Sequence, residues 1–146
     1  MLANDLLNSG AIPTLEAMLR FSGARQRIIA HNVAGLTTPG FIPMDVSTSA
    51  FQQQLSKAIE KRNEATGGMT GELELPETNE VSQRPDGSLE LTPQTPSGGI
   101  LFHDRNNRDL ERLMQDQAEN FGVYRIASEL LRSRMSSLRD AIAERV

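Results

Sequence analysis

The C-terminal third of the chain has the sequence LERLMQDQAENFGVYRIASELLRSRMSSLRDAIAER over residues 110–145. Its apolar residues recur at alternating steps of four and three, which is the heptad spacing of a helix that packs against other helices. Gln117, Ser128 and Arg145 are the polar exceptions in this pattern. The pattern predicts one long helix within residues 104–146, with an assembly seam made of Leu110, Met114, Phe121, Tyr124, Leu131, Met135, Leu138 and Ile142.

A second helical pattern begins near the other end of the chain. Pro13 suits the first turn of a helix, where its missing N–H is not needed, and apolar residues then follow at spacings of three and four. The pattern ends at Thr37-Thr38-Pro39-Gly40, because the residue before a proline avoids the helical region and Pro-Gly favours a turn. We therefore predict a helix over residues 13–36, with a seam made of Leu15, Met18, Leu19, Ile29, Val33 and Leu36.

The middle of the chain has a different composition. Residues 49–65 carry apolar side chains at helical spacing and predict a short amphipathic helix, whereas residues 66–99 are rich in Gly, Pro and acidic residues. Within the latter, residues 72–75 and 88–91 alternate like strands, and Pro85-Asp86-Gly87 favours a turn. The sequence leaves two structures open for this stretch, a small β-hairpin or a flexible acidic loop.

These patterns predict a mainly α fold in three segments: residues 1–43, a polar and flexible middle at 44–103, and residues 104–146. The simplest way to bury both seams is an antiparallel coiled-coil pair of the two terminal helices. Each helix of such a pair still exposes apolar surface on the side away from its partner. We therefore expect the core to be completed by assembly with further helices, as a homo-oligomer or with another helical protein.

Composition and charge exclude several classes of function. The chain has no Cys, which rules out disulfides, thiolate metal sites and Cys nucleophiles. Its formal net charge is −4, and the basic residues are interspersed with acidic ones and form no basic face, so we predict no nucleic-acid binding. No apolar run has the roughly 20 residues of a membrane span. The first ten residues lack the basic start and apolar middle of a signal peptide, so we expect no cleaved leader.

Candidate catalytic residues are few. The two histidines, His31 and His103, lie in no metal-binding spacing, and we expect structural or solvated roles for both. The acidic residues Glu72, Glu74, Glu77 and Glu80 could imitate a glycosidase pair, but catalytic carboxylates need a rigid frame. We predict no catalytic residue, no metal site and no cofactor, and regard a cell-wall glycan hydrolase as the weaker alternative.

One motif is unusual for a helix end. Residues 32–41 have the sequence NVAGLTTPGF. It resembles the N-terminal signature of bacterial flagellar rod and hook proteins, Asn-x-Ala-Asn-x-x-Thr-Pro-Gly followed by Phe or Tyr. Gly35 departs from the signature, standing where the family has its second Asn. The residues that match are Asn32, Ala34, Thr38, Pro39, Gly40 and Phe41.

The C-terminal third and the chain length resemble the short proximal rod subunits of that family. The matching features are His103, Asn106-Asn107, Asp109-Leu110-Glu111, Met114, Ala118-Glu119-Asn120, Tyr124, Leu130-Leu131 and Leu138-Arg139-x-Ala141-Ile142. The resemblance implies a structural subunit of the flagellar basal body rod, the hollow periplasmic shaft that transmits torque from the motor to the hook. It also implies terminal helices packed around the rod channel.

The same resemblance implies the partners of the chain. These are further copies, other rod proteins and the ring-to-rod linker protein, together with the flagellar type III export apparatus that carries such subunits out of the cytoplasm without a cleaved signal. Two alternatives stay open, namely another short rod subunit and a cytoplasmic helical adaptor or export chaperone. The adaptor would explain the heptads but not the Thr-Pro-Gly motif.

Overall fold

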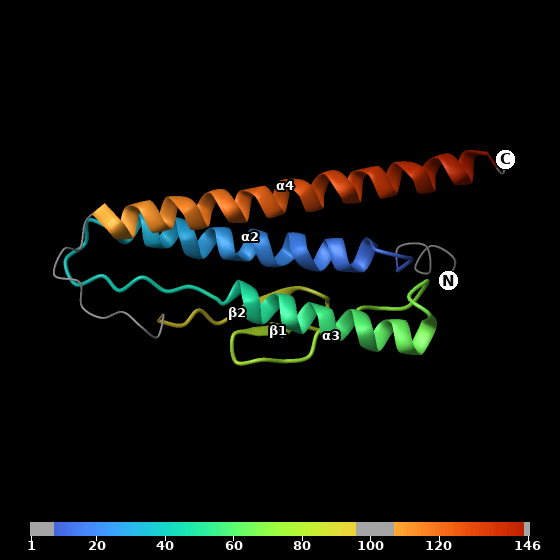
Figure 1. Ribbon diagram of the computed structural model, residues 1–146, viewed down its shortest axis with the longest axis horizontal. Coiled ribbons are helices and arrows are strands. Elements are labelled where there is room, and N and C mark those ends of the chain that lie inside the picture. Colours follow the sequence, from blue (N-terminus) through green and yellow to red (C-terminus); the bar gives the residue numbers. More distant parts are fainter. Residues whose placement is uncertain (1–7, 96–106, 145–146) are drawn as a thin grey trace.

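The computed structural model describes residues 8–95 and 107–144. Within these ranges the elements, labelled as in Figure 1, are α2 (Ile12–Gly35), α3 (Thr48–Thr66), β1 (Val81–Gln83), β2 (Leu89–Leu91) and α4 (Asn107–Ala143). The mainly helical fold with long terminal helices is confirmed. Of the two structures left open for the middle segment, the β-hairpin is the one observed.

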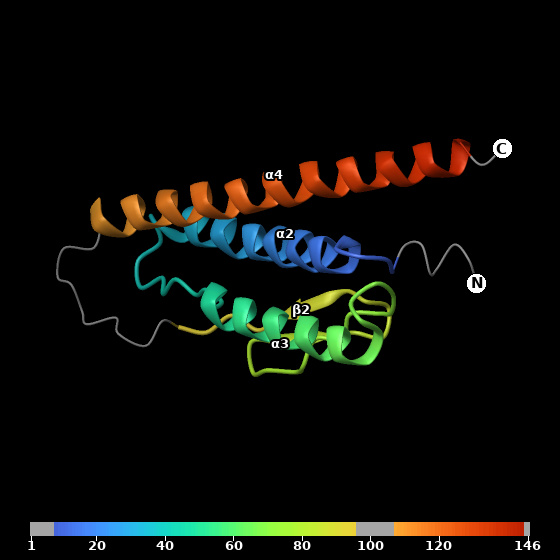
Figure 2. The same cartoon turned by 45° about the vertical axis from the view of Figure 1, so that its right-hand side comes forward.

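The elements form three layers with α2 in the centre. α4 lies along one side of α2, and α3 with the hairpin lies along the other (Figures 1 and 2). α2 and α4 run antiparallel, and the C-terminal end of α4 extends beyond the start of α2 (Figure 1). None of the helices in the described ranges is both long and apolar enough to cross a bilayer.

Local sequence accounts for the helix ends. Pro13 lies in the first turn of α2, and that helix ends at Gly35, just before the Thr-Thr-Pro-Gly turn. At the start of α3 the hydroxyl of Ser47 accepts a hydrogen bond of 3.1 Å from the backbone N–H of Ala50, which is a typical N-cap. α3 ends at Thr66 and is capped by Gly67, whose φ of 67° is in the left-handed region that glycine adopts without strain.

The hydrophobic core lies between α2 and the middle segment. The rings of Phe21 from α2 and Phe51 from α3 stack with centroids 3.9 Å apart. Aliphatic side chains from α3, from the stretch after it and from the hairpin surround this pair, so the middle segment contributes most of the core. The buried members of the core are Ala17, Phe21, Val46, Phe51, Leu55, Ala58, Leu73, Leu75 and Val81.

The hairpin differs from the predicted strand pair in one strand. β2 lies within the predicted stretch 88–91 and the turn at Pro85-Asp86-Gly87 is confirmed, but β2 pairs with β1, in the register Val81↔Leu91 and Gln83↔Leu89. The other predicted strand, residues 72–75, is extended but joins no ladder. The amide of Gln83 replaces the ladder there, accepting a hydrogen bond of 2.9 Å from the Leu75 N–H and donating one of 3.4 Å to the Leu73 carbonyl.

Candidate assembly surface

α4 contacts α2 through a narrow and partly polar stripe. Its buried residues are Leu113, Asn120 and Ala127, which we call the docked stripe. The Asn120 amide donates two hydrogen bonds to α2, one of 2.9 Å to the Ser22 carbonyl and one of 3.0 Å to the Gln26 side chain. Asn120 is only 4% exposed and Ala127 is fully buried, so these small residues allow α4 to approach α2 closely.

A buried arginine lies beside this contact. Arg25 on α2 donates hydrogen bonds of 3.0 and 2.6 Å to the two carboxylate oxygens of Asp45, and its guanidinium is 3.7 Å from the Asp116 carboxylate on α4. Arg25 therefore links α2 both to the start of the middle segment and to α4. Because Arg25 is shared between two carboxylates, it stabilises the charged form of Asp116 incompletely. The pKa of Asp116 therefore depends on the balance between burial and the neighbouring charges.

Burial raises the pKa of Asp116 above the ordinary value for an aspartate, and the negative charge of Asp45 acts in the same direction. The attraction of Arg25 opposes this shift without cancelling it. The short distance to Arg25 alone would suggest that the ionised form is favoured. Desolvation outweighs that attraction, because Asp116 receives no hydrogen bond from Arg25 comparable to the two that Asp45 accepts.

The predicted C-terminal seam lies mostly outside the α2 contact. Met114 and Phe121 are each 61% exposed, although both are large and apolar. The other seam residues divide into two groups: Leu110, Tyr124 and Ile142 are exposed, whereas Leu131, Met135 and Leu138 are half-buried. The seam is therefore largely uncovered in the single chain.

The predicted N-terminal seam is better covered. Leu15 and Ile29 are buried, whereas Met18, Leu19 and Leu36 are half-buried. Val33, near the end of α2, is 40% exposed. α2 thus has neighbours on two sides, whereas α4 has a neighbour on one.

The signature motif forms a compact reversal after α2. The Asn32 side chain is buried and makes a two-way contact with the backbone of Met44, donating a hydrogen bond of 2.6 Å to its carbonyl and accepting one of 3.2 Å from its N–H. Between these two residues the chain turns at Gly40, which has a φ of 75°. The remaining motif residues Ala34, Thr38 and Pro39 are exposed. Asn32 therefore fixes where the chain returns from the turn.

The Phe41 ring packs directly on Gly35. A Cβ atom at position 35 would lie 2.4–2.5 Å from three carbons of that ring. His31, one turn earlier, contacts the same ring edge-on with centroids 5.5 Å apart. The absence of a side chain at Gly35 is therefore what allows Phe41 to occupy this place.

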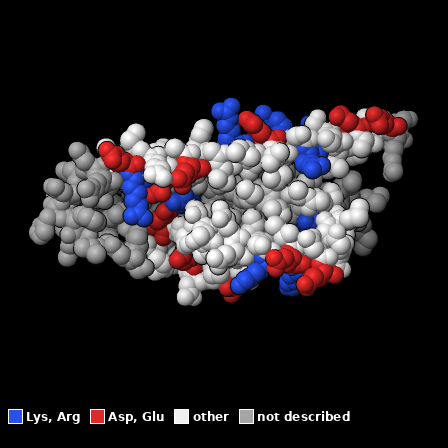
Figure 3. All heavy atoms as spheres, in the orientation of Figure 1, with Lys and Arg blue, Asp and Glu red and all other residues white. Residues whose placement is uncertain are grey.

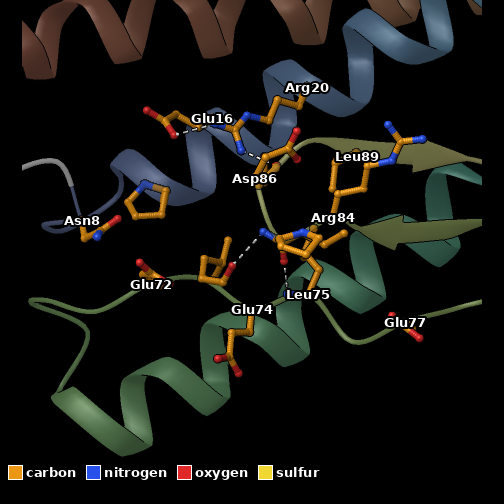
Figure 4. A pocket seen from close by; sticks show the side chains of 16 residues that line it. Asn8, Glu16, Arg20, Glu72, Glu74, Leu75, Glu77, Arg84, Asp86 and Leu89 are labelled. Carbon is orange, nitrogen blue, oxygen red and sulfur yellow. Dashed lines mark hydrogen bonds and ion pairs between the residues drawn. The ribbon is translucent and has the colours of Figure 1, made fainter. Parts of the chain in front are cut away.

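The acidic residues considered for catalysis lie at two places in the fold. Glu72, Glu74 and Glu77 line a cavity of about 500 Å³ between the chain before β1, the first half of α2 and the hairpin turn (Figure 4). Glu74 forms an ion pair of 2.9 Å with Lys61. Glu80 lies elsewhere and accepts a hydrogen bond of 2.6 Å from the Ser47 N–H. Two of the four carboxylates are thus occupied by structural contacts.

The charge distribution also distinguishes the central surface from its edges. On the face drawn in Figure 3, the middle of the molecule over α2 and its borders is largely uncharged, and the charged side chains lie mainly toward the edges. His103 and Asn106, which contributed to the family resemblance, lie outside the described residues.

Sequence reasoning did not identify Arg25 and Asn120 as interface residues. A signal for each was present. Arg25 stands four residues from both Phe21 and Ile29, on the apolar stripe of α2, and Asn120 stands seven residues from both Leu113 and Ala127. A polar residue at such a position is typical of a buried hydrogen-bonded group.

These features define a class of protein: a mainly helical protein with its own small core and a long C-terminal helix that leaves much of its predicted apolar seam uncovered. No family model matches the chain. It is 28% identical to the flagellar basal body rod protein FlgB of Salmonella typhimurium (strain LT2) over 137 residues, covering 88% of this chain and 94% of that protein. This similarity suggests the flagellar rod family and supports a structural role in the rod.

Proposed function

We propose that this chain is a structural subunit of the proximal flagellar rod, of the FlgB type, which polymerises through its terminal helices. In this role it forms part of the hollow shaft that carries torque across the periplasm from motor to hook. The observation that carries the proposal is the exposure of Met114 and Phe121, each 61%, on a long helix of the folded chain. Large apolar side chains grouped in this way are typical of a surface that another protein covers.

Six exposed apolar residues of α4 lie in two groups on either side of the α2 contact. At about 100° per residue, Leu110, Met114 and Phe121 lie roughly 80–120° to one side of Asn120 around the helix. We call them the Phe121 flank. Val123, Ile126 and Leu130 lie roughly 60–120° to the other side and form the Ile126 flank. All six residues are at least 40% exposed.

Two different flanks favour an open array over a closed pair. A two-fold dimer needs one self-complementary surface, whereas a head-to-tail array needs two surfaces that fit each other. The Phe121 flank carries one Leu, one Met and one Phe side chain, and the Ile126 flank carries only aliphatic ones. We propose that the Phe121 flank of one subunit packs near the Ile126 flank of the next, which produces the helical lattice of a tube.

The proposal also includes the partners of the chain in the periplasmic rod of the basal body. These are neighbouring copies, other rod proteins, the ring-to-rod linker protein and, before assembly, the flagellar type III export apparatus. It makes the chain a structural protein rather than an enzyme. The similarity to FlgB supports this role, and the heptad pattern of α4 supports it independently.

The test is the substitution Phe121→Asp. The side chain is 61% exposed, so the isolated subunit should keep its helical circular dichroism, while a charge on the flank should block packing by a neighbour. We expect loss of swimming and absence of the chain from purified hook–basal bodies. Ser136→Asp is the matched control, because Ser136 is exposed on the side of α4 away from α2.

Normal motility of the Phe121→Asp strain would contradict the proposal. Electron microscopy of basal bodies containing a labelled chain would separate it from the adaptor alternative, because an export chaperone or adaptor would be absent from the purified rod.

A further inference from the structure

We propose that neighbouring subunits pack with an axial offset of about 17 Å, so that the Phe121 flank of one α4 lies level with the Ile126 flank of the next. The inference rests on the proposed function, because it names the register in which two copies of the chain fit together. Its basis is the different height of the two flanks along α4. The Phe121 flank spans residues 110–121 and the Ile126 flank spans residues 123–130. Their midpoints differ by about 11 residues, which corresponds to about 17 Å of helix.

The two flanks also lie on roughly opposite sides of α4, with the α2 contact between them. A third subunit can therefore join the second in the same way, and the row continues without closing into a pair. The subunits of a helical array are related by rotation about one axis and translation along it. Copies of α4 that run along this axis are therefore parallel, and the charged residues beside the flanks distinguish between the possible offsets.

With no offset, the contact would place charged side chains against apolar ones. Arg112 and Glu119 lie on the same side of α4 as the Ile126 flank and would face Met114 and Phe121 of the neighbour. Both charged side chains are exposed in the single subunit. This register takes them out of water against apolar partners, which is costly for an unpaired charge.

An offset of the same size in the opposite direction is unfavourable for the same reason. It would place the Ile126 flank against the part of the neighbouring helix that carries Arg132 and Arg139. These two arginines lie on the same side of α4 as Phe121, and both are exposed in the single subunit. The apolar Ile126 flank would again cover charges and leave the Phe121 flank in water.

The proposed offset places apolar side chains of one helix against apolar side chains of the next. The six flank residues then meet in three pairs, each level to within about 3 Å along the axis: Leu110 with Val123, Met114 with Ile126, and Phe121 with Leu130 of the neighbour. All six are at least 40% exposed in the single subunit. Beyond these pairs, Arg125 lies level with Ser137, an exposed polar residue, so this register sets no charge against an apolar flank.

The experiment is disulfide cross-linking between two copies that carry one thiol each. The chain contains no Cys, so each substitution introduces one unambiguous thiol. Leu110→Cys is co-expressed with Val123→Cys, and in a second strain Phe121→Cys is co-expressed with Leu130→Cys, with a tag on one copy to change its mass. The control pair is Leu110→Cys with Gln53→Cys, because Gln53 is exposed on α3, on the other side of α2 (Figure 1). We expect oxidation of purified hook–basal bodies to link both test pairs about tenfold more than the control, since a disulfide needs Cα atoms within about 7 Å.

Other registers give different links. Phe121→Cys with Val123→Cys links at zero offset, and Leu110→Cys with Leu130→Cys links in an antiparallel pair. Either of these links in place of the two expected ones overturns the proposal. The absence of a link in all four pairs also overturns it.

The same pairs are tested on the purified chain at high concentration, which separates this inference from the proposed function. If the expected links form there while the labelled chain is absent from basal bodies, the register stands and the proposed function fails. If the chain is present in basal bodies and Phe121→Asp abolishes swimming while the expected links do not form, the proposed function stands and the register fails.

Discussion

Replacement of Gly35 by Ala tests the most crowded contact in the signature motif. The backbone of Gly35 is helical and not left-handed, so alanine is conformationally allowed there. The obstacle is the Phe41 ring, three carbons of which would lie 2.4–2.5 Å from the new Cβ. Real Cβ atoms do not approach that closely, so the ring has to leave its place beside His31. The family Asn at this position would meet the same obstacle.

The expected change in stability combines two opposing contributions. Gly→Ala in a helix gains up to about 1 kcal/mol from backbone propensity. Forcing a methyl group into occupied space costs about 1–3 kcal/mol, including lost packing of the displaced ring. We therefore expect Gly35→Ala to lower the free energy of unfolding by up to about 2 kcal/mol. Gly122→Ala is the matched control: no atom lies within 4 Å of the Cβ position of Gly122, so its propensity gain should be retained.

The assay is urea unfolding followed by far-ultraviolet circular dichroism. It should give opposite signs for the two variants, destabilising at 35 and stabilising by up to about 1 kcal/mol at 122. A double-mutant cycle isolates the clash, because in a Phe41→Ala background the obstacle is gone and Gly35→Ala should also stabilise. Equal stabilisation by Gly35→Ala and Gly122→Ala in the native background would refute the reasoning.

Two further substitutions test the polar contacts. Asn32→Ala removes both hydrogen bonds to the Met44 backbone and should lower the free energy of unfolding by about 1–3 kcal/mol in chemical denaturation; a loss no larger than that of an exposed Asn→Ala control would contradict the contact. Asp116→Asn should leave stability at pH 7 unchanged or higher, because the raised pKa of Asp116 means that the native fold disfavours its ionised form. As the pH falls through that raised pKa toward the unfolded value, the native chain gains stability by taking up a proton and the variant does not, so any advantage of the variant should shrink; an advantage that grows on acidification would contradict this.

The helices could be predicted from sequence because their signals are local. The 3.6-residue period, Pro13 and the Thr-Pro-Gly stop place α2 within one residue of its observed bounds. Residues 72–75 show where local reasoning ends. Leu73 and Leu75 alternate with polar residues and are buried, as in a strand. No neighbouring strand pairs with this stretch, and the side-chain amide of Gln83 accepts the Leu75 N–H instead.

The surface of α4 that meets α2 could not be predicted with the same certainty. The heptad pattern identifies the apolar residues of α4, yet the buried residues Leu113, Asn120 and Ala127 lie outside it, and of the predicted seam only Leu131, Met135 and Leu138 are half-buried. Asn120 in this contact donates hydrogen bonds to the Ser22 carbonyl and the Gln26 side chain, which lie 98 and 94 residues earlier in the chain. Contacts of this kind depend on tertiary geometry, which no local period encodes.

That separation has a kinetic consequence. The links within the α2–α3–hairpin unit span short stretches of chain, 20 residues for Arg25 to Asp45 and 27 for Gln54 to Val81, so their loops close early. α4 can dock on α2 only after the 98-residue loop between Ser22 and Asn120 has closed, and this loop is almost five times as long as the one between Arg25 and Asp45. We expect α4 to dock last and to detach first in native-state fluctuations. A newly exported chain would then have a folded α2–α3–hairpin unit while α4 is still free to pack either on its own α2 or on a neighbouring chain.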